Sequence, residues 1–439
     1  MAITFKGGIH VKEYKNTAHT HITAITPPKT VKIPLSQHIG APCTPCVKVG
    51  ERVLRGQKIG DVSSGLGCPV HSSISGNVKE ITYHIAPNGA RIEDVIIEND
   101  FQNELHPSIS PSDRELSSTT ADEIIGIVRD AGISGMGGAT FPTYAKIKSA
   151  IGKVDTLIIN GAECEPFITA NNRLINERPE QVIEGTRILL HVFGLSEALI
   201  AIEDNKPHSI QIMTEMTEGD TSINVRPVKT KYPQGDERQL IYALTGRQLP
   251  TGKLPADVGC VVFNVETVAS IYRAFYLGLP LIERIVTVDG DCIKEPKNLL
   301  VPIGTSLKAL IEECGGLTRT PKYLINGGPM MGHAMWDFEN GVTKGTSAIL
   351  ALSEQFTPTY DQPHECIRCG RCVSACPMHL TPNYLAAYAR RGLYDTADEL
   401  NVRSCVECGA CSYMCPAYIP IVQYIRVAKA ALNAKGVKR

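Results

Sequence analysis

Residues 130–148 read DAGISGMGGATFPTYAKIK, which places four glycines between residues 132 and 138. Loops of this kind bring backbone N–H groups close to an anion, because glycine has no Cβ to block the approach. Gly132 and Gly137 have the spacing of GxxxxGK[ST], but Gly138 and Ala139 stand where that motif has its lysine and its serine or threonine. The loop does not match GxGxxG either. The stretch therefore predicts a phosphate-binding loop ahead of a helix that carries Lys146, and it leaves open which phosphate is bound.

Three segments after the glycine loop combine a buried strand or turn with polar residues and a following helix. They are VDTLIINGAECEP (154–166), YPQGDERQLIYALTG (232–246) and GCVVFNVETVASIYRA (259–274). Polar residues at the carboxyl ends of strands are where α/β sheets bind ligands. The pattern predicts a parallel α/β sheet with ligands gathered along one edge.

Composition describes an ordinary globular protein of two to four domains. The 439 residues are 43% hydrophobic and 20% charged, with a formal net charge of −1, which gives no general attraction to nucleic acid. The N-terminus lacks the apolar core of a signal peptide, and no apolar run has the length of a transmembrane helix. We expect a cytoplasmic protein, or one held at a membrane only through partners.

Eight of the fifteen cysteines form two identical runs near the C-terminus. Each run, CIRCGRCVSACP and CVECGACSYMCP, is the C-x2-C-x2-C-x3-C-P pattern of bacterial two-cluster ferredoxins, in which the fourth cysteine binds the other cluster. Paired zinc sites are the alternative, but the repeated run with its terminal proline favours two [4Fe–4S] clusters. One cluster is assigned to Cys366, Cys369, Cys372 and Cys415, and the second to Cys405, Cys408, Cys411 and Cys376.

Iron–sulfur clusters pass single electrons, whereas soluble donors such as NADH deliver hydride. A flavin is the usual converter between the two, and its phosphate would explain the glycine loop. GISGMGGATFPTYAK resembles the glycine loop of the flavin- and NADH-binding subunit of respiratory complex I, and NGAECEP, QGDE and NVET resemble three further motifs of that family in the same order. The resemblance covers residues 130–275.

This resemblance implies that the chain binds FMN and NAD(H), with no acid–base residue needed for hydride transfer. The implied FMN contacts are Gly135, Gly137, Gly138, Lys146, Asn160, Glu163, Gly235, Glu237, Asn264 and Thr267, and the implied NADH contact is Glu165. Ser134 and Met136 stand where that family has arginines, and Ala162 replaces an aspartate. These departures support an alternative hypothesis, a relay or scaffold protein that has lost its flavin.

The flanking regions suggest a multidomain α/β and α+β architecture. Residues 1–118 resemble a biotinyl/lipoyl-type hammerhead (barrel-sandwich) β domain without a modifiable lysine, and residues 119–282 form the Rossmann-like FMN/NADH domain. Residues 283–355 resemble a soluble-ligand-binding β-grasp domain, and residues 356–439 form the helical two-cluster ferredoxin module. A polar, proline-containing linker, SEQFTPTYDQPHE (353–365), lies at the boundary between them. Within the module we expect two short helices around Gly392, and an amphipathic helix with a basic tail after the second cysteine run. Cys43, Cys46 and Cys68 lie in the first domain and are interpreted as free thiols.

The order of these domains resembles the RnfC family of Rnf complexes, which are membrane-bound ferredoxin:NAD oxidoreductases coupled to Na⁺ or H⁺ translocation. FKGGIH (5–10) and PVHSSISG (69–76) are particularly similar. The resemblance implies a peripheral protein on the cytoplasmic face of the cell membrane. Its partners would be the membrane and iron–sulfur subunits of the complex, with ferredoxin reached indirectly through them.

Two further enzyme hypotheses remain open at the level of sequence. One is a cobalamin reductase of a diol-degrading microcompartment, which shares this architecture. The other is an NADH-input subunit of a soluble hydrogenase or formate dehydrogenase, which the missing loop arginines disfavour.

Overall fold

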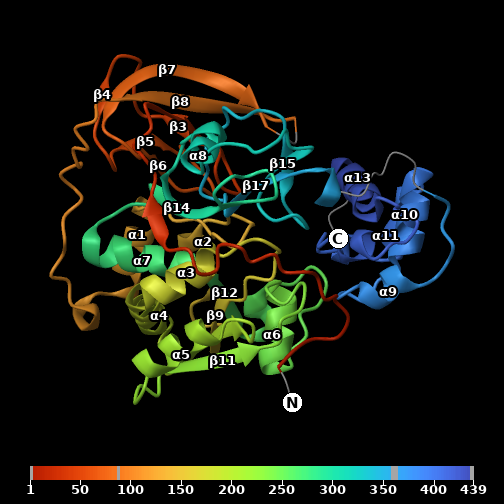
Figure 1. Ribbon diagram of the computed structural model, residues 1–439. Coiled ribbons are helices and arrows are strands. Elements are labelled where there is room, and N and C mark those ends of the chain that lie inside the picture. Colours follow the sequence, from red (N-terminus) through yellow and green to blue (C-terminus); the bar gives the residue numbers. More distant parts are fainter. Residues whose placement is uncertain (1–2, 87–88, 357–363, 436–439) are drawn as a thin grey trace.

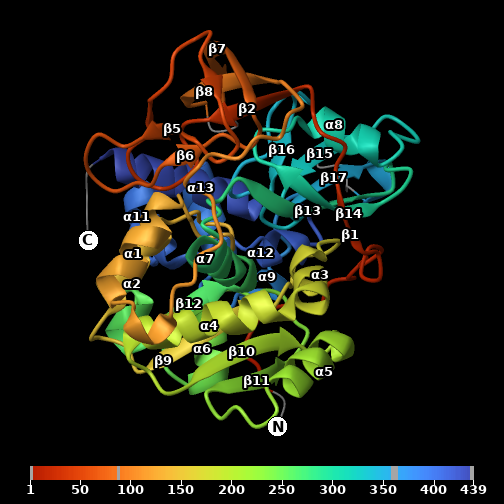
Figure 2. The ribbon, with the colours of Figure 1, turned by 90° about the vertical axis from the view of Figure 1, so that its left-hand side faces the viewer.

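The structure is a computed structural model that describes residues 3–86, 89–356 and 364–435. Two β-rich lobes stack on a parallel α/β domain, and a group of helices near the C-terminus lies to one side (Figure 1). A quarter turn of the molecule separates the three β-containing parts clearly (Figure 2).

The parallel sheet predicted from the strand–turn–helix segments is present. Its order is β11-β10-β9-β12, and all three pairings are parallel. The strands are β9 (Thr156–Gly161), β10 (Ala198–Glu203), β11 (Ile223–Val228) and β12 (Cys260–Asn264). The helices are α1 (Ala121–Asp130), α2 (Thr143–Ala150), α3 (Ala170–Glu177), α4 (Pro179–Phe193), α5 (Pro207–Met216), α6 (Glu237–Thr245) and α7 (Val265–Leu277).

Successive side chains of β9 point to opposite faces of this sheet, and helices cover both faces. Leu157 and Ile159 pack in the large core with α1, α4 and α7, whereas Ile158 packs in a smaller core with Leu240 and Ile241 of α6. A sheet buried on both faces is the usual consequence of parallel strands joined by helices. Its carboxyl edge is therefore left to the loops that follow the strands.

The N-terminal β lobe consists of two small antiparallel sheets, ordered β2-β8-β7-β4 and β3-β5-β6. Their strands are β2 (Thr30–Pro34), β3 (Thr44–Pro45), β4 (Arg52–Val53), β5 (Lys58–Asp61), β6 (Val70–His71), β7 (Gly76–Ile85) and β8 (Arg91–Asn99). Val31, Ile33 and Ile97 of these sheets belong to the same core as α1 and α7, so the lobe is packed firmly on the parallel-sheet domain.

The second β lobe, called here the β-grasp lobe after the domain predicted for residues 283–355, is a six-stranded mixed sheet ordered β1-β14-β13-β17-β15-β16. Its elements are β1 (Ile22–Ala24), β13 (Glu283–Asp289), β14 (Lys297–Pro302), α8 (Leu307–Glu313), β15 (Tyr323–Asn326), β16 (His333–Met335) and β17 (Ala348–Leu352). β13 pairs parallel with β17, and β1 pairs parallel with β14. The addition of β1, from the other end of the chain, was not predicted from the sequence.

The C-terminal helices carry or flank the two cysteine runs. They are α9 (Arg371–Ala375), α10 (Pro382–Arg390), α11 (Tyr394–Glu399), α12 (Ala410–Tyr413) and α13 (Ile421–Ala434). As predicted, two short helices flank Gly392 and an amphipathic helix follows the second run. Residues 357–363 of the predicted linker and the basic tail at 436–439 lie outside the described residues. Within the described ranges, no helix is both long and apolar enough to span a membrane.

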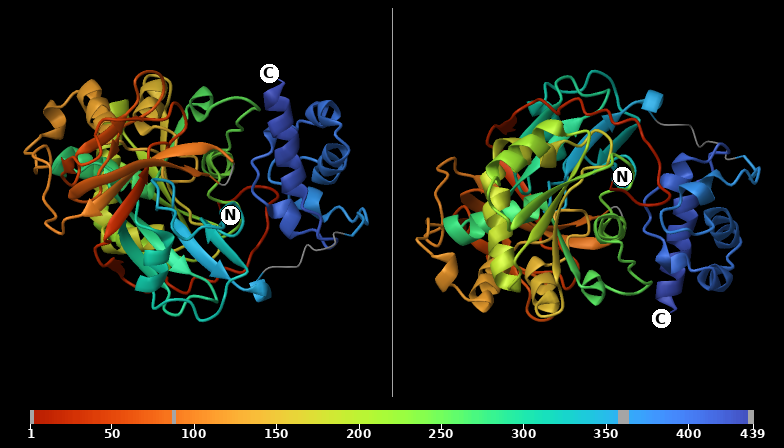
Figure 3. Two further views of the ribbon diagram at one scale, coloured as in Figure 1. Left: turned by 90° about the horizontal axis from the view of Figure 1, so that it is seen from above. Right: turned by 90° about the horizontal axis from the view of Figure 1, so that it is seen from below.

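Residues 3–20 form an extended segment, called here the strap, that crosses the carboxyl edge of the parallel sheet. It passes between the parallel-sheet domain and the C-terminal helices before it enters β1 (Figure 3). Ile3 bridges to Val228 at the end of β11, and Ile9 bridges to Tyr232 just beyond it. The strap therefore lies over the edge where ligands were expected.

Candidate functional site

The glycine loop lies at the carboxyl ends of β9 and β12, next to the start of α7. The Met136 N–H donates to Thr267 Oγ1 at 3.0 Å, and the Gly135 N–H donates to the Phe141 carbonyl at 2.8 Å. Asn264 ends β12 and caps α7, because its Oδ1 accepts from the Glu266 N–H at 2.9 Å. The loop and the positive end of the α7 dipole thus share one corner of the sheet.

Packing within the chain does not explain two of the loop's glycines. A Cβ built on Gly137 would lie 3.5 Å from the Asn264 Cβ, and one on Gly135 would lie 3.6 Å from the Phe141 carbonyl oxygen, both ordinary contacts. Neither residue has a positive φ, whereas Gly138 has φ +116° and needs glycine for its backbone. Room beside the loop backbone fits a ligand that approaches the N–H groups closely.

Lys146, Glu237, Asn160 and Gly235 complete this corner. The Lys146 ammonium donates to Glu237 Oε1 at 2.6 Å, with both side chains partly exposed, and lies 5.4 Å from the centre of the Phe263 ring. Asn160 at the end of β9 donates to the Gly235 carbonyl at 2.9 Å. Gly235 is required here, because a Cβ would lie 2.6 Å from the Ala162 carbonyl oxygen. Nine of the eleven predicted FMN and NADH residues are thus in or beside this corner.

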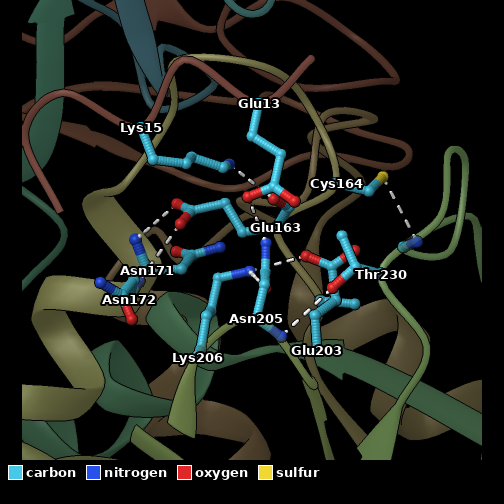
Figure 4. A network of polar contacts seen from close by, with 12 residues as sticks. Glu13, Lys15, Glu163, Cys164, Asn171, Asn172, Glu203, Asn205, Lys206 and Thr230 are labelled. Carbon is cyan, nitrogen blue, oxygen red and sulfur yellow. Dashed lines mark hydrogen bonds and ion pairs between the residues drawn. The ribbon is translucent and has the colours of Figure 1, made fainter. Parts of the chain in front are cut away.

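The other two predicted residues, Glu163 and Glu165, turn toward the strap. Glu163 is buried and accepts from the Asn171 N–H at 2.8 Å and the Asn172 N–H at 3.4 Å, at the start of α3 (Figure 4). Burial raises the pKa of Glu163, and the nearby Lys15 opposes the rise. Its carboxylate therefore fixes α3 to the loop after β9.

Lys15 of the strap closes over that loop. Its ammonium donates to the carbonyls of Glu163, Glu165 and Ile168 at 2.8, 2.8 and 2.6 Å. Burial lowers the pKa of Lys15, while Glu163 acts in the opposite direction. One side chain from the strap thus fixes three backbone carbonyls that follow β9, about 150 residues away in the sequence.

A buried ion pair beneath the strap belongs to the same network. Lys206 donates to Glu203 Oε2 at 2.6 Å, and both side chains are buried. Burial alone would lower the pKa of Lys206, but Glu203 and Glu163 more than offset it, so the pKa is raised. Asn205 donates to Glu13 of the strap at 2.8 Å. Figure 4 shows Glu13 and Lys15 facing Glu203 and Lys206 across the network.

A cavity of about 330 Å³ opens between the strap and the loops after β9, β10 and β11. It is lined by His10, Val11, Glu13, Lys15, Glu163, Cys164, Glu165, Glu203, Asp204, Asn205, Lys229, Thr230, Lys231 and Tyr232. The carboxyl edge therefore has two parts, the glycine-loop corner on the β12 side and this strap-covered cavity on the β10 and β11 side.

Glu165 reaches the β-grasp lobe rather than the glycine loop. Its carboxylate accepts from the Met330 N–H at 3.0 Å and the Met331 N–H at 2.9 Å. Burial raises its pKa to about 7, although these two N–H groups favour the charged form. Glu165 thus ties the loop after β9 to the GGPMMG turn (residues 327–332) of the β-grasp lobe.

The cysteines of the two runs occupy different environments. Cys376, Cys405, Cys408 and Cys411, called here the inner set, line one small apolar cavity together. The Leu380 N–H donates to Cys376 Sγ at 3.4 Å, and the Glu407 N–H donates to Cys405 Sγ at 3.3 Å. Cys366, Cys369, Cys372 and Cys415 are called the outer set, of which Cys366 and Cys369 are exposed. Across the described residues, no three Cys, His, Asp or Glu side chains are placed to hold a single metal ion.

Several residues of this region carried no signal in the sequence. Lys15, Glu13, Glu203, Lys206 and Tyr232 matched no motif, and FKGGIH was noted only as a resemblance. The one usable signal was the pair of glycines at 7 and 8, both of which have positive φ.

Comparisons with known proteins match four successive segments of the chain to family models. Four family models match, described as an RnfC barrel sandwich hybrid domain (3–102), a Nuo51 FMN-binding domain (128–273), an SLBB domain (285–334) and a 4Fe-4S dicluster domain (359–429). Their order agrees with the predicted order of domains. The boundaries at 118, 282 and 355 stay predictions.

Full-length relatives are also similar. The chain is 43% identical to the C component of the Na⁺-translocating ferredoxin:NAD⁺ oxidoreductase complex of Acetobacterium woodii, covering 98% of both chains. It is 44% identical to the proton-translocating counterpart of Clostridium ljungdahlii, covering 99% of this chain and 95% of the relative. A solved structure, an NAD⁺-reducing [NiFe]-hydrogenase in the air-oxidized state, matches 72% of this chain and 69% of its own with a TM-score of 0.51 and 17% identity, which shows a shared fold.

Proposed function

The chain belongs to the RnfC family of ion-translocating ferredoxin:NAD⁺ oxidoreductase complexes, and from this we propose that it is the component that exchanges electrons with NAD(H). It would pass them singly, through two [4Fe–4S] clusters, to or from partner subunits. The observation that carries the proposal is that one edge of the parallel sheet holds an FMN-type glycine loop and also contacts the two-cluster module, through the strap and through Tyr232.

The glycine-loop corner suits FMN. Gly135 and Gly137 leave space beside the backbone, and Lys146 and the start of α7 supply positive charge for a phosphate. When bound, FMN supplies the chemistry of accepting a hydride and releasing its electrons one at a time. We propose the FMN contacts as Gly135, Gly137, Gly138, Lys146, Asn160, Gly235, Glu237, Asn264 and Thr267. The resemblance also implies Glu163 as an FMN contact and Glu165 as an NADH contact, but their carboxylates bond to the start of α3 and to the GGPMMG turn, so we propose that these two residues act by fixing the loop after β9.

Hydride transfer leaves the protein a positioning task. The backbone N–H groups of the glycine loop would hold the phosphate, and Asn160 keeps the Gly235 turn in place through its bond to the Gly235 carbonyl. The strap forms one wall of the neighbouring cavity, on the β10 and β11 side of the same edge.

The placement of the cysteines supports an order for the two clusters. The inner set adjoins the parallel-sheet domain, since Cys408 and Ala410 share a hydrophobic cluster with Tyr232 and Ile9. The outer set includes the exposed Cys366 and Cys369. We therefore propose that electrons from the flavin side enter at the cluster of the inner set and leave toward a partner from the cluster of the outer set.

The names of the relatives describe components of ion-translocating complexes. We accordingly propose that this chain is a peripheral protein at the cytoplasmic face of a membrane, held there by membrane and iron–sulfur subunits. Ion translocation, of Na⁺ or H⁺, would belong to the assembled complex. The cobalamin-reductase and hydrogenase hypotheses lack a comparable full-length match among the relatives reported above.

An anaerobic NADH titration of the cluster-reconstituted protein with FMN tests this function. We expect loss of the flavin absorbance and of the cluster absorbance to be complete at about two equivalents of NADH, since the flavin takes two electrons and each cluster takes one. Clusters that form normally in a protein that neither binds FMN nor responds to NADH would instead support the flavin-less relay.

A further inference from the structure

Tyr232 connects the parallel-sheet domain to the loop that carries the inner cysteine set. Its ring is 1% exposed and packs with Ile9, Ala375 and Ala410. Its hydroxyl donates to the carbonyl oxygen of Cys408 at 2.6 Å. Tyr232 lies three residues before Gly235, so the same short segment reaches the glycine-loop corner at one end and a cluster ligand at the other.

The strap fixes the backbone of Tyr232 in this place. The Ile9 N–H donates to the Tyr232 carbonyl, and the Tyr232 N–H donates to the Ile9 carbonyl, both at 2.8 Å. The neighbouring Gly8 N–H donates to the Ala375 carbonyl of α9 at 3.0 Å. Two consecutive strap residues therefore bond to the parallel-sheet domain on one side and to the cluster module on the other.

The two glycines of FKGGIH are required by this close approach. Gly7 has φ +77°, and a Cβ there would lie 2.7 Å from the carbonyl oxygen of the cluster ligand Cys376. Gly8 has φ +71°, and its Cβ would lie 2.6 Å from the Tyr232 carbonyl oxygen. Contacts this short are not tolerated with backbone atoms, so glycine is needed at both positions.

We propose that Tyr232, held by the Gly7–Ile9 part of the strap, is a positioning residue that fixes the Cys405–Cys411 loop against the flavin-binding edge. Its hydroxyl acts on the peptide carbonyl of a cluster ligand and takes no part in the redox chemistry. The inference rests on the proposed function for its purpose, electron transfer between flavin and inner cluster. The mechanical link itself rests only on the contacts described above.

The test is Tyr232→Phe, which keeps the buried ring and removes one hydroxyl. Tyr83→Phe serves as the matched control, because Tyr83 is half exposed on the N-terminal β lobe. Hydrogen–deuterium exchange at residues 405–411 reports the position of the loop. We expect exchange there to be about two- to tenfold faster in Tyr232→Phe and unchanged in the control, as for the loss of one buried hydrogen bond.

A second readout separates positioning from simple stability. In single-turnover mixing with NADH, we expect Tyr232→Phe to reduce its flavin at the wild-type rate and to reduce its clusters more slowly, with unchanged cluster content. Exchange and cluster reduction equal to wild type would overturn the proposal. If NADH fails to reduce the wild-type flavin, the proposed function fails, while the exchange measurement still decides whether Tyr232 fixes the loop.

Gly7→Ala provides an independent variant that leaves Tyr232 intact. Its methyl group would press on the Cys376 carbonyl, so we expect the same faster exchange at residues 405–411 as in Tyr232→Phe. Wild-type exchange in Gly7→Ala would show that the strap does not fix this loop and would also overturn the proposal.

Discussion

Gly137 has room for a methyl group beside the Asn264 side chain, so its role can be tested without disturbing the fold. We expect Gly137→Ala to unfold at the wild-type temperature and to bind FMN about tenfold more weakly or worse, because the methyl group would displace the ligand from the loop backbone. Quenching of FMN fluorescence measures the affinity. Gly126→Ala is the control, since its Cβ meets open space on α1. Equal affinities would remove the glycine loop from the flavin site.

Asp289 predicts a pH dependence of stability. It is fully buried at the end of β13, and both its hydrogen bonds, from Asn16 Nδ2 at 3.1 Å and the Gly290 N–H at 2.7 Å, go to Oδ1. Burial raises its pKa to about 6 from an ordinary 3.8. The folded chain therefore binds this proton more tightly than the unfolded chain, and stability falls as the pH rises from about 4 to about 6.

Asp289→Asn removes that charge while its Oδ1 can keep both hydrogen bonds. We expect a gain of about 2 kcal/mol in unfolding free energy at pH 8, and little gain at pH 4. Asp220→Asn should behave in the opposite way, because the Ser222 hydroxyl and Arg187 lower the pKa of Asp220 to about 2. Thermal unfolding of the three proteins at both pH values is the measurement. A gain for Asp289→Asn that is equal at the two pH values would contradict the assignment.

The strap fixes the loop after β9 through a single side chain, Lys15. Lys15→Met would leave the carbonyls of Glu163, Glu165 and Ile168 without their donor. We expect a loss of about 1–3 kcal/mol in stability and weaker FMN binding, because the loop after β9 adjoins proposed flavin contacts. Denaturant unfolding and FMN affinity check this, with Lys6→Met on the same strap as the exposed control. If Lys15→Met lowers stability and FMN affinity no more than Lys6→Met does, the strap merely leads to β1 and does not stabilise the loop after β9.

Local elements were the part of the fold that sequence reasoning predicted well. Strong local signals mark the strands at 156–161 and 260–264, which are apolar runs, and the two short helices around Gly392, where the glycine ends the first helix. The strap and β1 were missed, because Lys15 bonds to Glu163 and β1 pairs with β14 through contacts between distant parts of the chain. An isolated lysine and a three-residue strand have no periodic pattern. Glu163 and Glu165 were found by motif, but their partners in α3 and the β-grasp lobe were not.

At the scale of the whole molecule, the two cysteine sets differ in exposure. Cys366 and Cys369 are exposed, whereas Cys376, Cys408 and Cys411 are buried. We expect an iron chelator with a mild oxidant to remove the clusters in two phases, the cluster of the outer set first. Visible absorbance and EPR spectra follow the loss, and a Cys366→Ser variant identifies the first phase by removing it. A single phase for both clusters would contradict the distinction between an inner and an outer cluster.

Contacts at the carboxyl edge of the parallel sheet join the domains of this chain. The strap begins at that edge, contacts the cluster module and leads into β1 of the β-grasp lobe. Glu165 and Tyr232 add two further links from the same edge, to the GGPMMG turn and to Cys408. The carboxyl edge with its glycine-loop corner and the inner cysteine set are therefore held together by several independent contacts.

We propose that electrons pass from NADH to the flavin-binding edge and then singly into the cluster module. Anaerobic stopped-flow mixing of the FMN- and cluster-loaded protein with one equivalent of NADH is the decisive experiment. We expect the flavin absorbance to fall first and then to recover in part as the cluster absorbance falls. Cluster absorbance that remains constant after the flavin is reduced, or a flavin that NADH does not reduce, would contradict it.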